Sequence, residues 1–228
     1  MGSFALDIAV SPLVGKSGAI FSELEKRFST GYYAFGDPIS VVELAAEFGV
    51  SQQPLRAALG QLRALGFVII TPQVGCRVAS PGEVEIRDFF NLFGRMEGVM
   101  AALAAERYDV AQLSHLEQVS ERIVACPIPT RGIPAEYAKL VREWHAALRL
   151  LADSSALAWR VGSFASMADF LLWQGAPNLT SEAISIANQQ RQAIRDAIAA
   201  RNGELAERLM FEHVRGKPQR VGILRNKP

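Results

Sequence analysis

The segment from Pro38 to Val78 most constrains the fold, because two helix signals and a hairpin signal follow one another with almost no chain between them. Ser40 precedes a short run of apolar residues at helical spacing, Gly49 interrupts it, and Ser51 precedes a second run. We therefore predict a helix-turn-helix. The expected apolar positions are Val42, Leu44, Ala45 and Phe48 in the first helix, and Leu55, Ala58, Leu59 and Leu62 in the second.

A β-hairpin is expected directly after this pair of helices. The β-branched run Val68–Thr71 is followed by turn residues and by a second short extended run, Cys76–Ala79. A hairpin in this place is typical of the wing of a winged helix-turn-helix.

The charge of this segment indicates a nucleic-acid surface. From Phe48 to Gly82 the chain has no Asp or Glu, but it contains Arg56, Arg63 and Arg77. A surface without acidic groups suits the phosphate backbone of DNA. Because the net charge is only +1 over 228 residues, DNA binding should be confined to one face of the protein.

The run LAAEFGVSQQPLRAALGQLRALGFV resembles the winged helix of the GntR family, whose usual form is LA..LGVSR.PVREAL..L...GLV. The run Val74–Val78 matches the family's Gly-tipped wing, and Phe35-Gly36-Asp37 is similar to the turn after its first helix. The resemblance implies sequence-specific binding of double-stranded DNA. The residues expected at DNA are Ser51, Gln52, Gln53, Arg56, Gln73, Gly75 and Arg77.

The recognition helix departs from the family pattern where bases would be read. Gln52 stands where Arg is common, Gln53 where Thr is common and Ala57 where Glu is common, while Arg56 is retained. Gln prefers the N6/N7 edge of adenine, whereas Arg prefers the O6/N7 edge of guanine. The operator is therefore expected to differ from the family's usual one, unless Gln52 and Gln53 touch only phosphate or solvent.

After the break at Ala79-Ser80-Pro81-Gly82, the chain shows a succession of amphipathic helical segments and no convincing strand. We predict a mainly α protein, with a winged helix-turn-helix domain at 1–80 and an all-α bundle of six or seven helices at 83–228. The first helix of the bundle should carry the apolar stripe Phe89, Phe93, Met96, Met100 and Leu103. Further helices are expected at about 110–125, from 134, and at about 154–173, 181–201 and 204–213, with a Pro-rich loop at 126–133 and a solvated basic tail at 215–227.

Composition predicts a soluble, cytoplasmic protein with no membrane partner. Half of the residues are apolar, which is enough for a core in each domain. No targeting segment is evident, and no uninterrupted apolar run approaches about 18 residues. The two cysteines, Cys76 and Cys126, fall in different domains and are expected to be free thiols.

The run LFGRMEGVMAALAAE resembles the opening helix of the FCD domain found in FadR-like members of the GntR family. This resemblance implies a helical domain that binds an effector and forms a homodimer. Phe93 stands where the opening helix often carries an arginine, so Arg95 is a candidate to replace that arginine at the effector.

Three polar residues lie on or beside apolar faces of the predicted bundle. His145 borders the stripe of the helix after Pro134, and Arg191 is the polar member of a stripe of Ile and Ala. His213 continues the apolar line of the last helix. We expect His145, Arg191 and His213 to point toward one interior.

The FCD resemblance implies a divalent metal held by Asp, His, His and His. The corresponding residues here are Val141, His145, Arg191 and His213. A permanent guanidinium cation repels a metal, and two histidines fall short of the usual three or four protein ligands. We predict no bound metal and no cofactor, the alternative being a metal held by the two histidines and a further carboxylate.

Arg191 needs an anion if it is buried, because a buried guanidinium without a counter-charge is costly. In one hypothesis Arg191 binds the carboxylate or phosphate of an effector, with His145, His213 and Arg95 nearby. In the other, Arg191 reaches out to solvent or forms an internal salt bridge. The candidate partners for that bridge are Glu97, Glu143 and Asp169.

The sequence thus predicts a homodimeric bacterial transcriptional regulator whose affinity for a palindromic operator is controlled by a small anionic metabolite. One alternative is a DNA-binding dimer with no effector. Another is an enzyme that uses His145, Arg191 and His213. The enzyme is disfavoured because no nucleophile with an adjacent base, paired catalytic carboxylates or Gly-rich phosphate loop can be identified.

Overall fold

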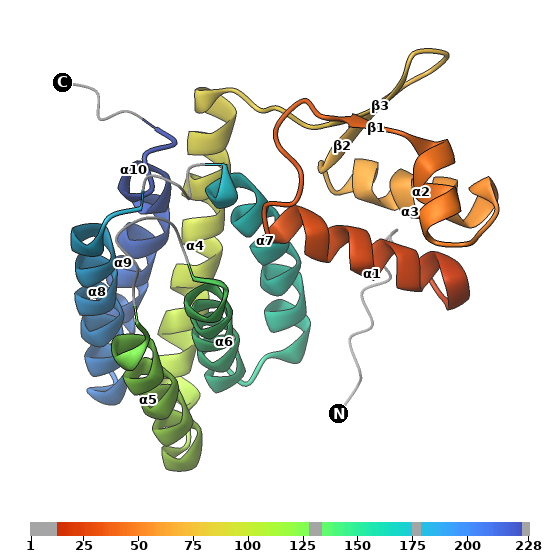
Figure 1. Cartoon of the computed structure of the whole chain (residues 1–228). Coiled ribbons are helices and arrows are strands. Elements are labelled where there is room, and N and C mark those ends of the chain that lie inside the picture. The colour runs from red at the N-terminus through yellow and green to blue at the C-terminus, as the bar shows by residue number, and fades with distance from the viewer. Residues whose placement is uncertain (1–12, 128–133, 175–178, 225–228) are drawn as a thin grey trace. The chain divides into compact units, whose positions relative to one another are not determined.

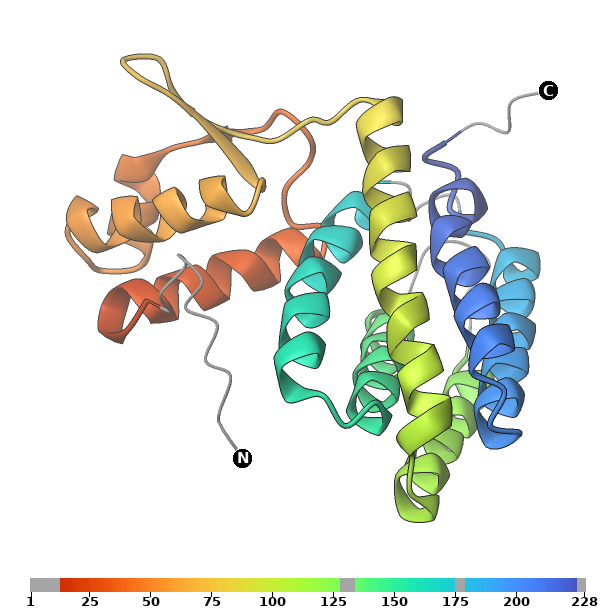
Figure 2. The same cartoon turned by 180° about the vertical axis from the view of Figure 1, so that it is seen from behind.

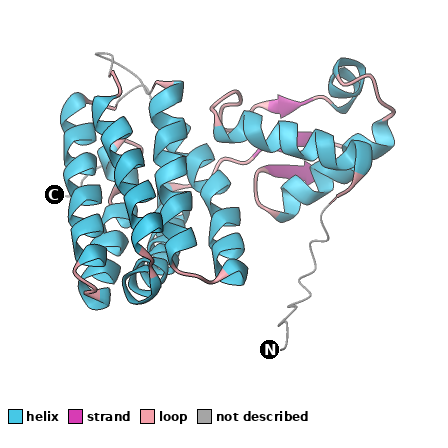
Figure 3. Ribbon diagram, turned by 90° about the horizontal axis from the view of Figure 1, so that it is seen from below, coloured by secondary structure: helices cyan, strands magenta, loops and turns pink. Residues whose placement is uncertain are grey.

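The computed structural model describes residues 13–127, 134–174 and 179–224 (Figure 1). The chain divides into two compact units, Met1–Ser80 and Pro81–Pro228. The strands belong to the first unit, and the described part of the second unit is helical (Figure 3). The first unit contains α1 (Gly15–Ser29), β1 (Pro38–Ile39), α2 (Val41–Glu47), α3 (Gln52–Ala64), β2 (Val68–Thr71) and β3 (Gly75–Val78). The second contains α4 (Glu83–Arg107), α5 (Val110–Ala125), α6 (Ala135–Leu151), α7 (Ser155–Trp173), α8 (Ser181–Ala199), α9 (Gly203–Arg215) and α10 (Lys217–Arg220).

The helix-turn-helix forms as the sequence predicts. The Ser40 hydroxyl accepts a hydrogen bond from the Glu43 N–H at 3.2 Å, which caps α2. Gly49 turns the chain with a φ of +62°, a conformation that L side chains rarely adopt, and α3 begins after Ser51. The expected buried face of α3 is confirmed, because Leu55, Ala58, Leu59 and Leu62 are all buried.

Val42 lies on α2 as expected, but it is 66% exposed. This helix has only seven residues and packs on α3 mainly through Leu44 and Ala45. So short a helix presents one narrow face to its neighbour, and Val42 lies outside that face.

The wing is the hairpin of β2 and β3, which pair antiparallel with Val68 opposite Val78 and Thr71 opposite Gly75. The two-residue strand β1 completes a sheet in the order β1-β3-β2 and was not expected. Two residues are too few to show the alternation of apolar and polar side chains by which strands are recognised in a sequence.

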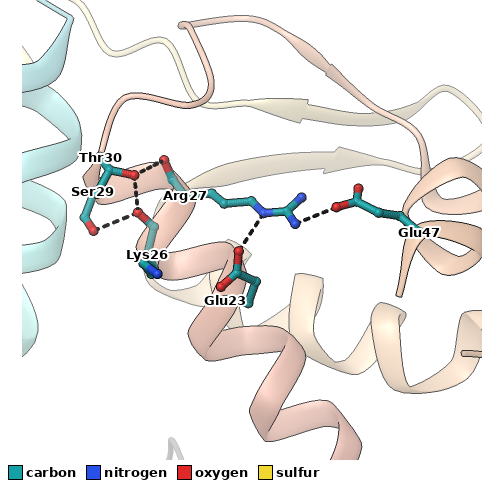
Figure 4. A network of polar contacts seen from close by, with 6 residues as sticks. All are labelled: Glu23, Lys26, Arg27, Ser29, Thr30 and Glu47. Atoms are coloured by element: carbon teal, nitrogen blue, oxygen red, sulfur yellow. Dashed lines mark hydrogen bonds and ion pairs between the residues drawn. The ribbon is translucent and has the colours of Figure 1, made fainter. Parts of the chain in front are cut away.

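The helix α1 is fixed to α2 by the guanidinium of Arg27 (Figure 4). Its Nε donates to Glu23 on the same helix at 3.0 Å, and its Nη2 donates to Glu47 at the end of α2 at 2.5 Å. At the end of α1 the Thr30 hydroxyl donates to the Lys26 carbonyl at 2.8 Å. The three helices thus form a scaffold that holds the start of α3 and the wing at the surface.

The second unit is built around α4, which packs against α6, α7, α8 and α9. Figure 2 shows α4 between α7 and α9. The predicted apolar stripe of α4 is partly right, because Phe93 and Met100 are buried whereas Phe89, Met96 and Leu103 are half-buried. A helix covered on several sides has no single buried stripe. At each predicted position of α4, the residue one place C-terminal to it is buried. The buried members of α4 include Ile86, Phe90, Phe93, Glu97, Met100, Ala101 and Ala104.

Close packing of α4 against α9 depends on two glycines one helical turn apart. A Cβ at Gly94 would lie 3.1 Å from the Phe211 carbonyl oxygen, and a Cβ at Gly98 would lie 3.0 Å from the Glu207 carbonyl oxygen. Both contacts are to backbone atoms of α9, which cannot move without the helix. The absence of side chains at these positions therefore sets the distance between the two helices.

The basic tail was expected to be solvated, but residues 217–220 form α10, and Lys217 and Arg220 are half-buried. Most of the expected Pro-rich loop, and residues 225–228 of the tail, lie outside the described residues.

Within the described ranges, no helix is both long and apolar enough to cross a membrane. Cys76 and Cys126 are free thiols.

Replacing Gly98 by alanine is expected to lower the free energy of unfolding of the helical unit by about 1 to 3 kcal/mol, because the new methyl group must displace the α9 backbone. Chemical denaturation followed by circular dichroism measures this change. The control is Gly162→Ala in α7, where the nearest atom to a new Cβ is Arg149 Nε at 4.0 Å, so this change should be neutral or slightly stabilising. Equal stability of the two variants would contradict the role of Gly98.

Candidate effector site and DNA interface

The residues expected at DNA all lie on the surface of the winged-helix unit. Ser51, Gln52, Gln53 and Arg56 are exposed around the start of α3, and Gln73, Gly75 and Arg77 are exposed on the wing. The Arg56 guanidinium donates to the Gln52 side-chain oxygen at 3.0 Å, so these two side chains lie together on one face. The Arg77 guanidinium donates to the Gly36 carbonyl at 3.2 Å, which holds it at the base of the wing. Both arginines keep further N–H groups that can reach phosphate or base edges.

The helical unit contains a cavity of about 100 Å³. Residues of α6, α7, α8, α9 and α10 line it, together with Leu179 before α8 and Val221 after α10. Its apolar wall includes Val141, Leu172, Trp173, Leu179, Ile184, Ala187 and Val221, and its charged members are Arg142, Asp169, Arg191, Lys217 and Arg220. A mostly apolar pocket with a few convergent charged groups is the usual form of a small-molecule site.

Arg191 is 3% exposed and lines this cavity. Its Nη2 donates to the Tyr137 hydroxyl at 2.9 Å and to the Asn188 side-chain oxygen. Both acceptors are neutral. Among the ion pairs of the described residues none includes Arg191, so its charge has no direct counter-charge in this part of the chain.

The three carboxylates considered as partners of Arg191 are used elsewhere. Glu97 accepts from Arg149 Nη1 at 2.5 Å, and Glu143 accepts from Arg122 at 2.7 Å. Asp169 Oδ2 lies 3.5 Å from Arg142 Nη1. The internal salt bridge hypothesised for Arg191 is therefore absent among the described residues. An anion that pairs with Arg191 would have to bind in the cavity.

His145 is buried between an acidic and a basic side chain. Lys217 Nζ donates to its Nε2 at 2.9 Å, so the proton of the neutral ring lies on Nδ1, which faces Glu97 Oε2 at 3.7 Å. Glu97 is fully buried. A line of charged and polar groups therefore runs from Arg149 through Glu97 and His145 to Lys217 at the cavity.

His213 is fully buried and lines the cavity, with its ring stacked on that of His145 at a centroid distance of 5.8 Å. Its Nδ1 donates to the Gln190 side-chain oxygen at 2.9 Å. Its Nε2 has no hydrogen-bond partner among the described residues. A buried polar atom without a partner is uncommon, and here it marks a position that a bound molecule or water can satisfy.

The electrostatics of the site disfavour further positive charge. Burial, followed by the Lys217 cation, lowers the pKa of His145 to about 3. Burial, with Lys217, Arg191 and Arg220 nearby, holds the pKa of His213 well below its usual value. Both rings are therefore neutral at pH 7.

Burial and the neighbouring charges also shift the pKa values of Lys217, Glu97 and Asp169. Burial lowers the pKa of Lys217 to about 8, against the opposing effect of Glu97 and Asp169, so this amine remains largely protonated at pH 7. Burial alone would raise the pKa of Glu97, but His145, Arg149 and Lys217 outweigh it and hold that pKa below its ordinary value. Burial raises the pKa of Asp169 to about 6.

Of the four residues expected at the effector, the structure brings three together. Arg191 and His213 line the cavity, and His145 lies directly behind Lys217. Arg95 does not join them, because it is exposed and its guanidinium lies over the Phe211 ring at 3.9 Å from the centroid. Its position on α4 points it at the outer side of α9.

Sequence reasoning missed Lys217, Arg220 and Tyr137 as cavity residues. The two cations were assigned to a solvated tail, because a basic segment after the last amphipathic helix has no apolar periodicity. The available signal was Pro218 directly after Gly216-Lys217, since proline is favoured in the first turn of a helix.

The site does not fit a divalent metal. Val141 offers no ligand, Arg191 carries a permanent positive charge, and Lys217 already donates to His145 Nε2, the nitrogen that would face an ion. Throughout the described residues, no three His, Cys, Asp or Glu side chains lie close enough together to hold a metal ion. The positive charge that a metal would supply comes instead from side chains.

Comparison with known families is decisive for the identity of both units. Residues 16–78 match the bacterial regulatory proteins of the gntR family, and residues 88–216, more than half of the chain, match the FCD domain. The chain belongs to the GntR family. It is a FadR-like member and thus a DNA-binding transcriptional regulator with a helical effector-binding domain. Both resemblances noted in the sequence are confirmed.

Relatives of this GntR regulator are transcriptional repressors. One is a probable D-xylose utilization operon transcriptional repressor of Paenarthrobacter nicotinovorans, 27% identical over 82% of this chain and 80% of the relative. Another is the transcriptional repressor GlaR of Escherichia coli, 29% identical over 75% of this chain and 80% of the relative.

Solved structures share the fold. Escherichia coli McbR/YncC superposes with a TM-score of 0.74 at 17% identity, covering 92% of this chain and 97% of that protein. A GntR regulator from Rhodococcus sp. RHA1 superposes with a TM-score of 0.69 at 18% identity, covering 93% and 100%. At these identities the likeness concerns the fold alone.

The neutral histidines predict a loss of stability in acid. In the unfolded chain a histidine binds a proton below about pH 6.5, whereas His145 and His213 stay neutral in the folded state. The unfolded state then binds more protons, so the free energy of unfolding should fall as pH drops below 6.5, by about 1.4 kcal/mol per pH unit for each histidine. Burial raises the pKa of Asp169 to about 6, so below pH 6 the folded protein binds a proton at this carboxylate. This proton cancels the contribution of one histidine to the pH dependence.

Urea denaturation between pH 7.5 and 5 measures this slope. His213→Gln should make it shallower, and His115→Gln, at an exposed position on α5, should leave it unchanged. Identical slopes for wild type and the His213 variant would show that His213 is protonated in the folded protein.

Proposed function

We propose that this GntR regulator is a cytoplasmic homodimer that binds a palindromic operator through α3 and the wing, and that a small anionic metabolite in the helical cavity changes its affinity for that operator. The observation that carries the proposal is Arg191, a buried guanidinium that faces a cavity and has no carboxylate partner among the described residues. A buried cation of this kind is stabilised by an anionic ligand.

Exposure and charge support the DNA interface. Gln52 and Arg56 lie one helical turn apart at the start of α3, the part of a recognition helix that reaches base edges. The surrounding segment carries no acidic residue from Phe48 to Gly82. We propose that these two side chains read bases and that Arg77 and the wing contact phosphates.

Exposed apolar side chains on α4 support the homodimer. Val84, Leu92 and Val99 lie on one side of α4, alongside the exposed charged residues Asp88 and Arg95, and are 63%, 55% and 44% exposed. A helix face with several exposed apolar side chains suits a partner helix. Two copies related by a twofold axis would present two α3 helices, which matches a palindromic operator.

The relatives support repression as the regulatory outcome. Both named relatives are repressors that align over most of their length. We propose that this protein represses its target genes and that the anion modulates repression. A regulator without an effector would have no evident use for a cavity lined by unpaired cations.

Arg56→Ala is expected to weaken binding to the operator by about 1 to 3 kcal/mol if the side chain reads a base, and to weaken binding to all sequences equally if it contacts phosphate. Fluorescence anisotropy with operator and scrambled duplexes distinguishes the two results. The control is Arg95→Ala, which removes the same charge from an exposed position in the helical unit. Unchanged DNA affinity of the Arg56 variant would remove it from the interface.

Arg191→Met is expected to abolish the thermal shift that anionic metabolites give to the wild type, while the apo protein keeps its stability within about 1 kcal/mol and its affinity for DNA. No counter-charge is stranded by the change, because Arg191 donates to Tyr137 and Asn188. Arg195→Met, one turn along α8 and paired with Glu117, is the control that should retain the ligand response. A loss of about 3 to 5 kcal/mol in apo stability with an intact ligand response would instead point to an internal salt bridge.

A further inference from the structure

The cavity carries more positive than negative charge, and the excess is localised. Its charged walls are four cations and one carboxylate, and that carboxylate, Asp169, lies 3.5 Å from Arg142. Behind the wall, Glu97 is in contact with Arg149. Each carboxylate of the cluster therefore already has an arginine, and the cations left over are Arg191, Lys217 and Arg220.

These three cations are hydrogen-bonded to neutral groups. Arg191 donates to a hydroxyl and an amide oxygen, Arg220 donates to the His213 carbonyl, and Lys217 donates to His145 Nε2. All three line the same cavity, so their charges repel one another. Burial and then the Arg191 cation lower the pKa of Arg220 to about 10, and Arg191 and Arg220 both act to lower the pKa of Lys217.

The charge of Lys217 is partly balanced from a distance. Glu97 lies beyond the His145 ring, and Asp169 stands across the cavity; both stabilise the protonated amine. The two arginines have no such support from a described carboxylate. The deficit in the cavity is thus about two negative charges, held by Arg191 on α8 and Arg220 on α10.

Two of the three cations come from a segment outside the family match. The FCD match ends at residue 216, and Lys217 and Arg220 follow directly in α10. A Cβ at Gly216 would lie 2.5 Å from Arg220 Nη1, so the glycine leaves room for the guanidinium in its present position. Arg191 lies inside the match, so the cluster of three cations joins a residue of the matched domain to two residues beyond it.

We propose that the cavity binds a small dianion, a short dicarboxylate or a phosphate monoester, with Arg191 and Arg220 as its two counter-charges and Lys217 as a third donor. The proposal rests on the proposed function and specifies the charge of the effector. A monoanion would leave one of the two arginines without a counter-charge, whereas a dianion can pair with both through charge-assisted hydrogen bonds. The apolar wall formed by Val141, Leu172 and Ile184 receives the short hydrocarbon part of the ligand.

Isomeric ligands that differ by one charge test this proposal. Methylmalonate and monomethyl malonate have the same atoms, but the first is a dianion at pH 7.5 and the second a monoanion. Ethyl phosphate and dimethyl phosphate form a second such pair. Isothermal titration of the full-length protein at constant ionic strength should show at least tenfold tighter binding of the dianion in one pair, and the responding pair identifies a dicarboxylate or a phosphate site.

Arg220→Gln should reduce the preference for the dianion to less than about threefold, because the second counter-charge is gone, while weak binding of both isomers through Arg191 remains. Arg208→Gln, an exposed change of the same charge on α9, should leave the preference intact. Because Arg220 also anchors α10 to α9, Lys217→Gln is the second variant, and it should weaken the dianion more than the monoanion. Thermal melts of the three variants check that each is folded.

Equal affinities within both pairs, or no heat from either dianion at 20 mM, would overturn the assignment of a dianion. The proposed function fails separately, when Arg191→Met leaves every anion response unchanged. A monoanion that binds as tightly as its isomer and is lost in the Arg191 variant would keep the proposed function and reject this inference.

Discussion

The buried carboxylate of Glu97 organises the helical unit. It lies on the central helix α4 with no exposed surface, so its charge has to be balanced within the protein. Arg149 on α6 supplies one hydrogen bond, and the neutral ring of His145, also on α6, faces the second oxygen. Through that ring the charge of Glu97 favours the protonated amine of Lys217, and so helps to keep α10 against the bundle.

The same arrangement gives the cavity positive charge that belongs to the protein itself. The FCD resemblance implies a divalent metal held by Asp, His, His and His, and the residues at two of these four positions are Val141 and Arg191. Here the positive charges belong to side chains, and the imidazoles serve as neutral hydrogen-bonding groups between them. Because Arg191 lies on α8 and Arg220 on α10, an anion that pairs with both would connect these two elements (Figure 1).

Sequence patterns predicted much of the fold, and their failures have definite causes. The α3 face was identified correctly because a thirteen-residue helix packed on one side shows a clear period. The exposure of Val42 was not predictable, because the seven-residue α2 has too few turns to define its buried face. The stripe of α4 was only partly right because several helices cover it at once. Arg191, His145 and His213 were found because a polar residue on an apolar stripe is visible in a sequence.

The sequence by itself determined the family, the winged helix and the inward direction of three polar side chains, because these depend on local spacing along single helices. Tertiary structure decided which charges meet. The pairing of Glu97 with Arg149 joins residues 52 positions apart, and Lys217 reaches His145 across 72 positions. Such contacts depend on how the helices pack, and the spacing of apolar residues along a single helix does not specify them. Whether Arg191 pairs with a carboxylate was therefore open in the sequence, and among the described residues its hydrogen-bond partners are the neutral side chains of Tyr137 and Asn188.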